Sequence, residues 1–258
     1  MSDRRYQDEN GKLIFHASNL QNYFECPKKY ELSTKIDLFE MTDAQRDGLL
    51  YEMYLFFNLE KYDDVMVKKL EGRKKSDTLD EIRAKAQSMS DYAQFDGQSF
   101  VPLSVDFGSF IIEGEADFIG NCQYRGKTIR CIADAKTTSD VYKLWLSKKT
   151  AYDYLQSVLY PMAWWKMTGE VLPFVYYIHD LKQDIKKTVL VKTTEQDFID
   201  MEKRLTAIAT EKSWEAKSCY ENCIYNRYRT SCKYIAYCQQ GAELYAPDEE
   251  ITYGSLIF

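Results

Sequence analysis

The sequence has little histidine, no long apolar run and no surplus of positive charge. Only two of its 258 residues are histidines, His16 and His179, too few for a site built on histidine. No run of eighteen apolar residues occurs, so we expect no transmembrane helix. The first ten residues are polar, so we expect no secretory signal and a cytoplasmic protein. The formal net charge is −6, so any nucleic-acid contact must use a local basic patch.

Cysteine is present in an uneven pattern. The seven cysteines are an odd number in a chain without an export signal, which argues against a disulfide framework. Four of them lie within twenty residues, Cys219, Cys223, Cys232 and Cys238. Such crowding in a reducing compartment indicates a metal or iron–sulfur site. Cys122 and Cys131 flank an expected turn, and we expect them to be buried strand residues.

The spacing of apolar residues predicts an α/β fold. Ser18 followed by Gln21 is a capping-box pattern that predicts a helix over 19–25, and Pro27 breaks or restarts it. The other expected helices are 42–59, 151–167 and 195–212. The expected strands are 110–119, 128–135, 174–178 and 188–192, the first two joined by a turn at Gly126. The charged stretch 67–94 has no sustained strand pattern, so we expect a helical insert outside the core.

Two of the expected strands end in acidic residues, Asp117 and Asp134, and Lys136 follows the second. In a hairpin the two aspartates reach one point, where two carboxylates repel unless a divalent cation lies between them. The two-residue period of a strand places Asp134 and Lys136 on the same face. Oxygen ligands and few histidines favour Mg²⁺ or Mn²⁺ over Zn²⁺. Taken alone, the pair is more typical of a structural salt bridge.

Five segments in order resemble a known nuclease family. They are SNLQNYFECPKKYEL, GEADFIG, IADAKTT, YDYLQSVLYPMAW and CKYIAYC. Together, from Ser18 to Cys238, they resemble the PD-(D/E)XK nuclease superfamily in its RecB-like exonuclease branch. That branch includes the iron–sulfur nucleases of CRISPR adaptation and of the AddB helicase–nuclease. The resemblance implies a restriction-endonuclease-like core, a mixed central sheet flanked by helices, with a helical insert and a cysteine-rich C-terminal lobe.

The resemblance also implies roles for the residues that match the family's strands. Asp117 and Asp134 are implied as metal ligands, and the carbonyl of Ala135 as a backbone ligand. Lys136 is implied to position or activate the attacking water and to stabilise the developing charge on the phosphate. Phosphodiester hydrolysis needs a deprotonated water and neutralisation of phosphate charge, which Mg²⁺ or Mn²⁺ held by carboxylates supplies.

Two helices contribute further residues by the same resemblance. Gln156 and Tyr160 match the Q-x-x-x-Y helix of the branch and lie one turn apart. The segment from Gly48 to Glu52 fits a G-x-x-x-H motif, with Glu52 in the place of a metal-binding histidine. Glu52 is therefore implied as a metal ligand, although glutamate is equally common on solvated helix faces.

The resemblance implies a 4Fe–4S cluster at the cysteines. Cys26, Cys232 and Cys238 match the family pattern, and the fourth ligand is Cys223, with Cys219 as the alternative. A zinc site formed by Cys219, Cys223, Cys232 and Cys238 is a rival interpretation. Buried thiols without a ligand are a third.

The loop after the last expected helix interleaves aromatic and basic residues, Arg227, Tyr228 and Arg229. Single-stranded DNA binds such surfaces by base stacking and phosphate pairing. Tyrosine packing around a metal cluster is an equally good explanation of this pattern.

The sequence predicts a single nuclease domain over 1–258. Its parts are N-terminal helices over 18–60, an insert over 61–98, a catalytic core over 99–212, a cysteine-rich lobe over 213–240 and a tail over 241–258. The expected activity is Mg²⁺- or Mn²⁺-dependent exonuclease cleavage of single-stranded DNA or duplex ends. The exonuclease preference comes from the resemblance alone.

The sequence has no P-loop, so a helicase, recombination or CRISPR-adaptation partner would be a separate chain. Phage recombination or replication and end repair are other settings that fit. One alternative is a non-catalytic module that uses the nuclease fold to bind nucleic acid or protein. Another is a zinc-stabilised adaptor.

Overall fold

The structure is a computed structural model that describes residues 7–35, 42–56, 79–139 and 155–210, together with Cys232, Tyr234 and Cys238. These residues form two compact units, each made of separated segments of the chain. The described residues up to 35, residues 108–111 and those from 204 onward form unit 1. Residues 42–107 and 112–203, where described, form unit 2. The predicted division of one nuclease domain into consecutive parts stays a prediction.

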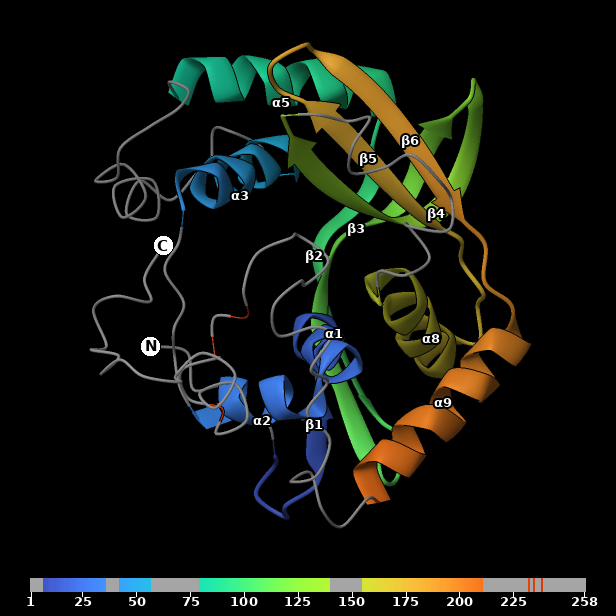
Figure 1. The fold of residues 1–258 in the computed structure, drawn as a ribbon. Helices are drawn as coiled ribbons and strands as arrows, with labels where there is room; N and C mark the ends of the chain where they lie inside the picture. Colours follow the sequence, from blue (N-terminus) through green and yellow to red (C-terminus); the bar gives the residue numbers. More distant parts are fainter. Residues whose placement is uncertain are drawn as a thin grey trace, which may run out of the picture. The chain divides into compact units, whose positions relative to one another are not determined.

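The elements of unit 1 lie at the two ends of the described chain (Figure 1). They are β1 (Leu13–Phe15), α1 (Ala17–Glu25), α2 (Pro27–Lys35) and the last turns of α9 (Glu195–Thr210). Phe15 packs on Phe110 with ring centroids 5.5 Å apart. The guanidinium of Arg204 lies 4.7 Å from the ring centroid of Phe24. Aromatic contacts therefore join segments of unit 1 that are distant in sequence.

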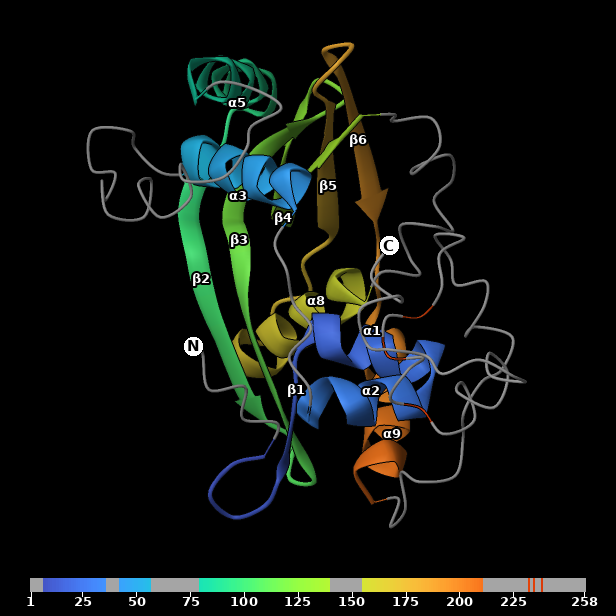
Figure 2. The same cartoon turned by 60° about the vertical axis from the view of Figure 1, so that its left-hand side comes forward.

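Unit 2 contains the remaining helices and strands (Figures 1 and 2). In chain order they are α3 (Asp43–Phe56), α5 (Leu79–Ala93), β2 (Asp96–Asp106), all but the first two residues of β3 (Phe110–Tyr124), β4 (Lys127–Thr138), α8 (Gln156–Thr168), β5 (Phe174–Asp180), β6 (Ile185–Val191) and most of α9. The predicted helices and strands are thus confirmed where the chain is described, with shifts of a few residues at their ends. None of the described helices is both long enough and apolar enough to cross a membrane.

The six strands form one mixed sheet. Its order is β1-β3-β4-β5-β6, and β2 pairs with β3. The pairs β3–β4 and β5–β6 are antiparallel, whereas β4 and β5 are parallel. Arg125 and Gly126 both have positive φ, 51° and 75°, as a two-residue hairpin turn requires. The α/β fold with a mixed central sheet is therefore confirmed.

The strands alternate between two faces of the sheet. Phe118 and Cys122 of β3, with Ala133 and Ala135 of β4, pack into one core with α3 and α5. Figures 1 and 2 both show α3 and α5 lying side by side. Because neighbouring strand residues face opposite ways, Asp134 points away from this core. Cys122 and Cys131 are free and fully buried, as predicted, with their Sγ atoms 2.8 Å apart.

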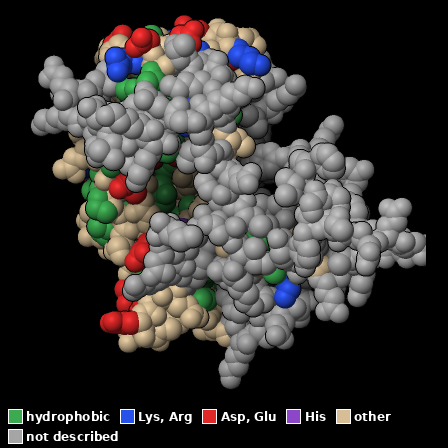
Figure 3. Space-filling model, turned by 90° about the vertical axis from the view of Figure 1, so that its left-hand side faces the viewer, with side chains coloured by type: hydrophobic (Ala, Val, Ile, Leu, Met, Phe, Trp, Pro, Cys, Tyr) green, Lys and Arg blue, Asp and Glu red, His purple; other side chains and the backbone are tan. Residues whose placement is uncertain are grey.

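One prediction fails at α5. Its buried residues Ile82, Ala86, Met89 and Ala93 repeat at helical spacing and belong to the main core. The helix is therefore part of the core and not an insert beside it. Its outer face carries charges of both signs, and Figure 3 shows red and blue side chains interspersed at the height of α5, at the top of the view. This polar face dominates the composition and hides the narrow apolar stripe.

Candidate active site

The two predicted aspartates lie where the β3–β4 pairing ends. The last paired residues are Phe118 and Ala133, and Asp117 and Asp134 come directly next to them. The Ala135 N–H donates to Oδ2 of Asp117 over 3.3 Å. Nζ of Lys136 donates to Oδ1 of Asp134 over 2.8 Å. The hairpin thus brings both carboxylates and the lysine together.

Helix α3 brings Glu52 to the same place. A Cβ atom on Gly48 would lie 3.0 Å from Oγ1 of Thr137, so glycine lets the helix approach β4 closely just after Lys136. Glu52 follows one turn later on the same side of the helix. Its carboxyl group interacts electrostatically with Lys136 and Asp134. In the predicted Gly48–Glu52 spacing, Gly48 therefore allows the helix to pack closely on β4, and Glu52 places a carboxyl group beside Lys136 and Asp134.

The four charged groups perturb one another strongly. Burial, with the charge of Asp134 adding to it, raises the pKa of Glu52 to about 7. Burial and then Asp134 raise the pKa of Asp117 well above its usual range. Burial lowers the pKa of Lys136, but the charges of Asp134, Asp117 and Glu52 outweigh it, and the net pKa is raised. Lys136 is therefore a cation at neutral pH, beside three carboxyl groups whose pKa values are raised.

One oxygen of this cluster has no hydrogen-bond partner among the described residues. Oδ2 of Asp134 is buried, and no hydrogen-bond donor reaches it within the described part of the chain. Burial raises the pKa of Asp134, while Lys136 and a hydrogen bond with Asp117 lower it. Asp117 can donate that hydrogen bond only when it is protonated. The space between the two carboxylates thus suits a proton or a cation.

The donor chemistry of the cluster fits a hard divalent cation. Mg²⁺ is usually held by only one or two carboxylates and keeps several waters, and Asp117 and Asp134 supply two. No three His, Cys, Asp or Glu side chains among the described residues are arranged to hold one metal ion together. The fit therefore rests on the two aspartates, with Glu52 beside them.

Helix α8 covers the cluster with its predicted motif. The side chain of Gln156 hydrogen-bonds the phenol of Tyr160, and burial raises the pKa of that phenol to about 12. The charges of Asp134 and Asp117 contribute to this raised pKa. A Cβ atom on Gly114 would lie 2.9 Å from Cε1 of Tyr160. Gly114 therefore makes room for the tyrosine, a role that the sequence pattern alone does not reveal.

Three predicted cluster cysteines lie in unit 1. Cys26 caps the C-terminal end of α1, and Cys238 is buried with Leu32 and Tyr234. Burial raises the pKa of the Cys232 thiol, and the nearby thiols of Cys26 and Cys238 raise it too. Cys26 and Cys238 therefore both lie near Cys232, although no three described side chains are arranged to hold one metal ion. Their role as cluster ligands stays a prediction.

Other predicted residues lie outside the described part of the chain. These are Cys219 and Cys223, and the proposed DNA-binding residues Arg227, Tyr228 and Arg229. The prediction of a fourth cluster ligand and of a stacking loop therefore stays a prediction.

Comparison with known proteins identifies the fold. No protein-family model and no curated protein matches the chain. The crystal structure of the "Putative exonuclease" from Eubacterium rectale matches with a TM-score of 0.53 and 15% identity, over 88% of this chain and 92% of that one. SSO0001 matches with a TM-score of 0.38 and 11% identity, over 91% of this chain and 88% of that one. The first likeness shows a shared α/β fold.

Proposed function

We propose that this protein is a metal-dependent nuclease that hydrolyses DNA phosphodiesters. The observation that carries the proposal is the cluster of Asp117, Asp134, Lys136 and Glu52 where the β3–β4 pairing ends, in which Asp134 is buried and the other three are half-buried. The exonuclease designation of the Eubacterium rectale protein, which has the same fold, supports this reading. The resemblance of the motifs to the RecB-like branch adds the finer proposal of exonuclease action on single strands or duplex ends.

The cluster residues have distinct roles in this proposal. Asp117 and Asp134 would hold Mg²⁺ or Mn²⁺ with the Ala135 carbonyl, and Glu52 beside them would add a third negative charge near the ion. The ion would supply charge neutralisation at the phosphate and a lower pKa for the attacking water. The Ala135 N–H fixes the orientation of Asp117 by its hydrogen bond.

Lys136 acts as a cation in this proposal. Its raised pKa keeps the ammonium group protonated at neutral pH, so it stabilises negative charge that develops on the phosphate. The bond to Asp134 holds Nζ in place. Tyr160, with a pKa of about 12, stays protonated and donates a hydrogen bond to substrate oxygens, with Gln156 orienting it.

The experiment compares cleavage of end-labelled single-stranded DNA, duplex DNA and RNA with Mn²⁺ and with EDTA. Lys136→Ala should reduce Mn²⁺-dependent cleavage by about a hundredfold or more. Lys127→Ala, an exposed lysine on the same strand, should leave it unchanged. The position of the label gives the polarity of cleavage. If the wild type binds all three substrates and cleaves none, the protein is a binding module.

We also propose that Cys26, Cys223, Cys232 and Cys238 hold a 4Fe–4S cluster. The thiols of Cys26 and Cys238 both lie near the thiol of Cys232 and raise its pKa, which supports this proposal. Anaerobically purified protein should then be brown and absorb broadly near about 400 nm. A colourless protein that contains zinc would replace the iron–sulfur proposal with the zinc site.

A further inference from the structure

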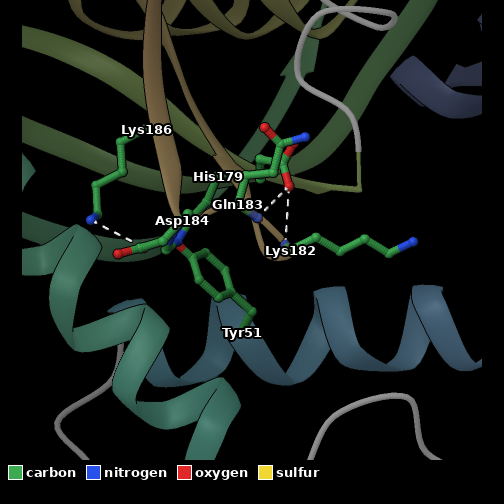
Figure 4. A network of polar contacts seen from close by, with 7 residues as sticks. Tyr51, His179, Lys182, Gln183, Asp184 and Lys186 are labelled. Atoms are coloured by element: carbon green, nitrogen blue, oxygen red, sulfur yellow. Dashed lines mark hydrogen bonds and ion pairs between the residues drawn. The ribbon is translucent and has the colours of Figure 1, made fainter.

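A chain of polar contacts connects α3 to the β5–β6 turn (Figure 4). The hydroxyl of Tyr51 lies 2.9 Å from Nδ1 of His179. Nε2 of His179 lies 2.6 Å from Oδ1 of Asp184, and Nζ of Lys186 lies 3.3 Å from the same oxygen. Tyr51 and His179 are fully buried, whereas Asp184 is at the surface. This chain of polar contacts therefore runs from the buried side of α3 to the protein surface.

The direction of each hydrogen bond follows from the chemistry of the groups. An ionised carboxylate only accepts, so Nε2 of His179 carries the hydrogen that Asp184 accepts. The bond from His179 lowers the pKa of Asp184 and keeps it ionised. Burial lowers the pKa of His179, so the ring is neutral and Nδ1 accepts from the Tyr51 hydroxyl. The two ring nitrogens of His179 thus have one donor and one acceptor partner.

This chain fixes α3 at the strand positions next to Lys136. In the β4–β5 register, His179 is paired with Thr137, and Lys136 with Ile178. Gly48 allows close contact with Thr137, and Tyr51 reaches His179 less than one turn later. Thr137 of β4 and His179 of β5, which are paired with each other, therefore contact Gly48 and Tyr51, which lie less than one turn apart on α3.

Glu52 follows Tyr51 directly on α3. Consecutive residues are about 100° apart around a helix, so the direction of Glu52 depends on how the helix is rotated about its axis. A bond from Tyr51 to the sheet sets that rotation.

We propose that Asp184, His179 and Tyr51 form a positioning chain that holds Glu52 at the Asp117–Asp134–Lys136 cluster. They are positioning residues, because they act through Glu52 and do not touch the substrate. The inference rests on the proposed function, since it takes the cluster to be the site of a divalent ion.

The test measures Mn²⁺ affinity by isothermal titration calorimetry on the full chain. Tyr51→Phe removes the hydroxyl and keeps the ring, and we expect binding about tenfold weaker. Tyr177→Phe is the matched control. Tyr177 is also fully buried on β5, and its hydroxyl donates to the Gln123 carbonyl over 2.7 Å. It should lower the melting temperature comparably and leave Mn²⁺ affinity unchanged.

A double-mutant cycle tests whether Tyr51 acts through Glu52. In the Glu52→Gln background, Tyr51→Phe should cause no further loss of Mn²⁺ affinity. Equal affinity of wild type and Tyr51→Phe would overturn the proposal, and so would an undiminished effect in the Glu52→Gln background.

A metal-free measurement separates this inference from the proposed function. Tyr51→Phe should speed amide hydrogen exchange in α3, and Tyr177→Phe should not. If the wild type binds no Mn²⁺, the proposed metal site fails, and faster exchange in α3 alone still supports the positioning chain. If exchange in α3 is unchanged, the positioning chain is overturned whatever the metal result.

Discussion

Two polar groups of residues lie near the junction of α3 with β4 and β5, and they differ in how well their atoms are paired. In the Tyr51–His179–Asp184 chain each bond has a donor and an acceptor. In the carboxylate cluster one aspartate oxygen has no donor among the described residues, and three acids have raised pKa values. Buried polar atoms are normally satisfied, so the first arrangement is typical of structure. The second is typical of a ligand-binding or catalytic site.

The largest expected effect is on the cluster. Asp117→Asn should weaken Mn²⁺ binding and cleavage by about a hundredfold or more. The same change should leave the metal-free protein as stable as wild type or stabilise it by about 1 kcal/mol, because it removes a carboxylate that repels Asp134. Calorimetric titration and urea unfolding measure the two effects. Loss of both stability and binding would show that the cluster is a structural ion-pair group.

The paired chain should respond in the opposite way. His179→Ala should lower the free energy of unfolding by about 2–4 kcal/mol, since it leaves a cavity and an unpaired tyrosine hydroxyl. Lys186→Ala, which removes only one partner of the exposed Asp184 carboxylate, should cost less than about 0.5 kcal/mol. Urea unfolding of the three proteins checks the order. Similar stabilities of His179→Ala and wild type would contradict a structural chain.

The raised pKa of Glu52 should be visible in the pH dependence of stability. Glu52 has a pKa of about 7 in the folded protein and about 4.3 when unfolded. Between about pH 4.3 and 7 the folded state therefore binds more protons than the unfolded state. The contribution of Glu52 to the free energy of unfolding is complete below about pH 4.3 and is lost as the pH rises through 7. Urea unfolding of wild type and Glu52→Gln without metal should show a flatter pH profile for the variant. Identical profiles would contradict the raised pKa.

A smaller effect is expected where α3 meets β4. Gly48→Ala places a methyl group 3.0 Å from Oγ1 of Thr137, so either the Thr137 side chain or the helix must shift by a few tenths of an ångström. We expect cleavage to fall by about tenfold, despite the better helix propensity of alanine. The double variant Gly48→Ala with Thr137→Ala should recover part of the activity. Absence of recovery would place the defect elsewhere.

Local patterns in the sequence predicted most of the hairpin and its charged residues. Asp117, Asp134 and Lys136 could be placed together because strand periodicity and a short turn determine the geometry over a few residues. The start of α3 at Thr42 was also predicted, and Thr42 and Gln45 cap it reciprocally. The predicted cap at Ser18 is wrong, because α1 begins at Ala17 after His16 without a side-chain cap bond.

Other features depend on contacts that no local pattern contains. Tyr51 and His179 are 128 residues apart in sequence, and either residue alone is typical of an ordinary core. The strand β1 has only three residues, too few to show alternation. The stripe on α5 was missed because charged neighbours outnumber it. These features arise from packing between distant segments.

The β3–β4 hairpin has a consequence for the order of folding. Asp117, Asp134 and Lys136 all belong to this one hairpin, whose contacts are local and close quickly. Glu52 and His179 can join only after much longer loops close. The lysine is therefore beside the two aspartates from the first moment that they meet. The positive charge of Lys136 thus offsets the repulsion between Asp117 and Asp134 while the two strands of the hairpin pair.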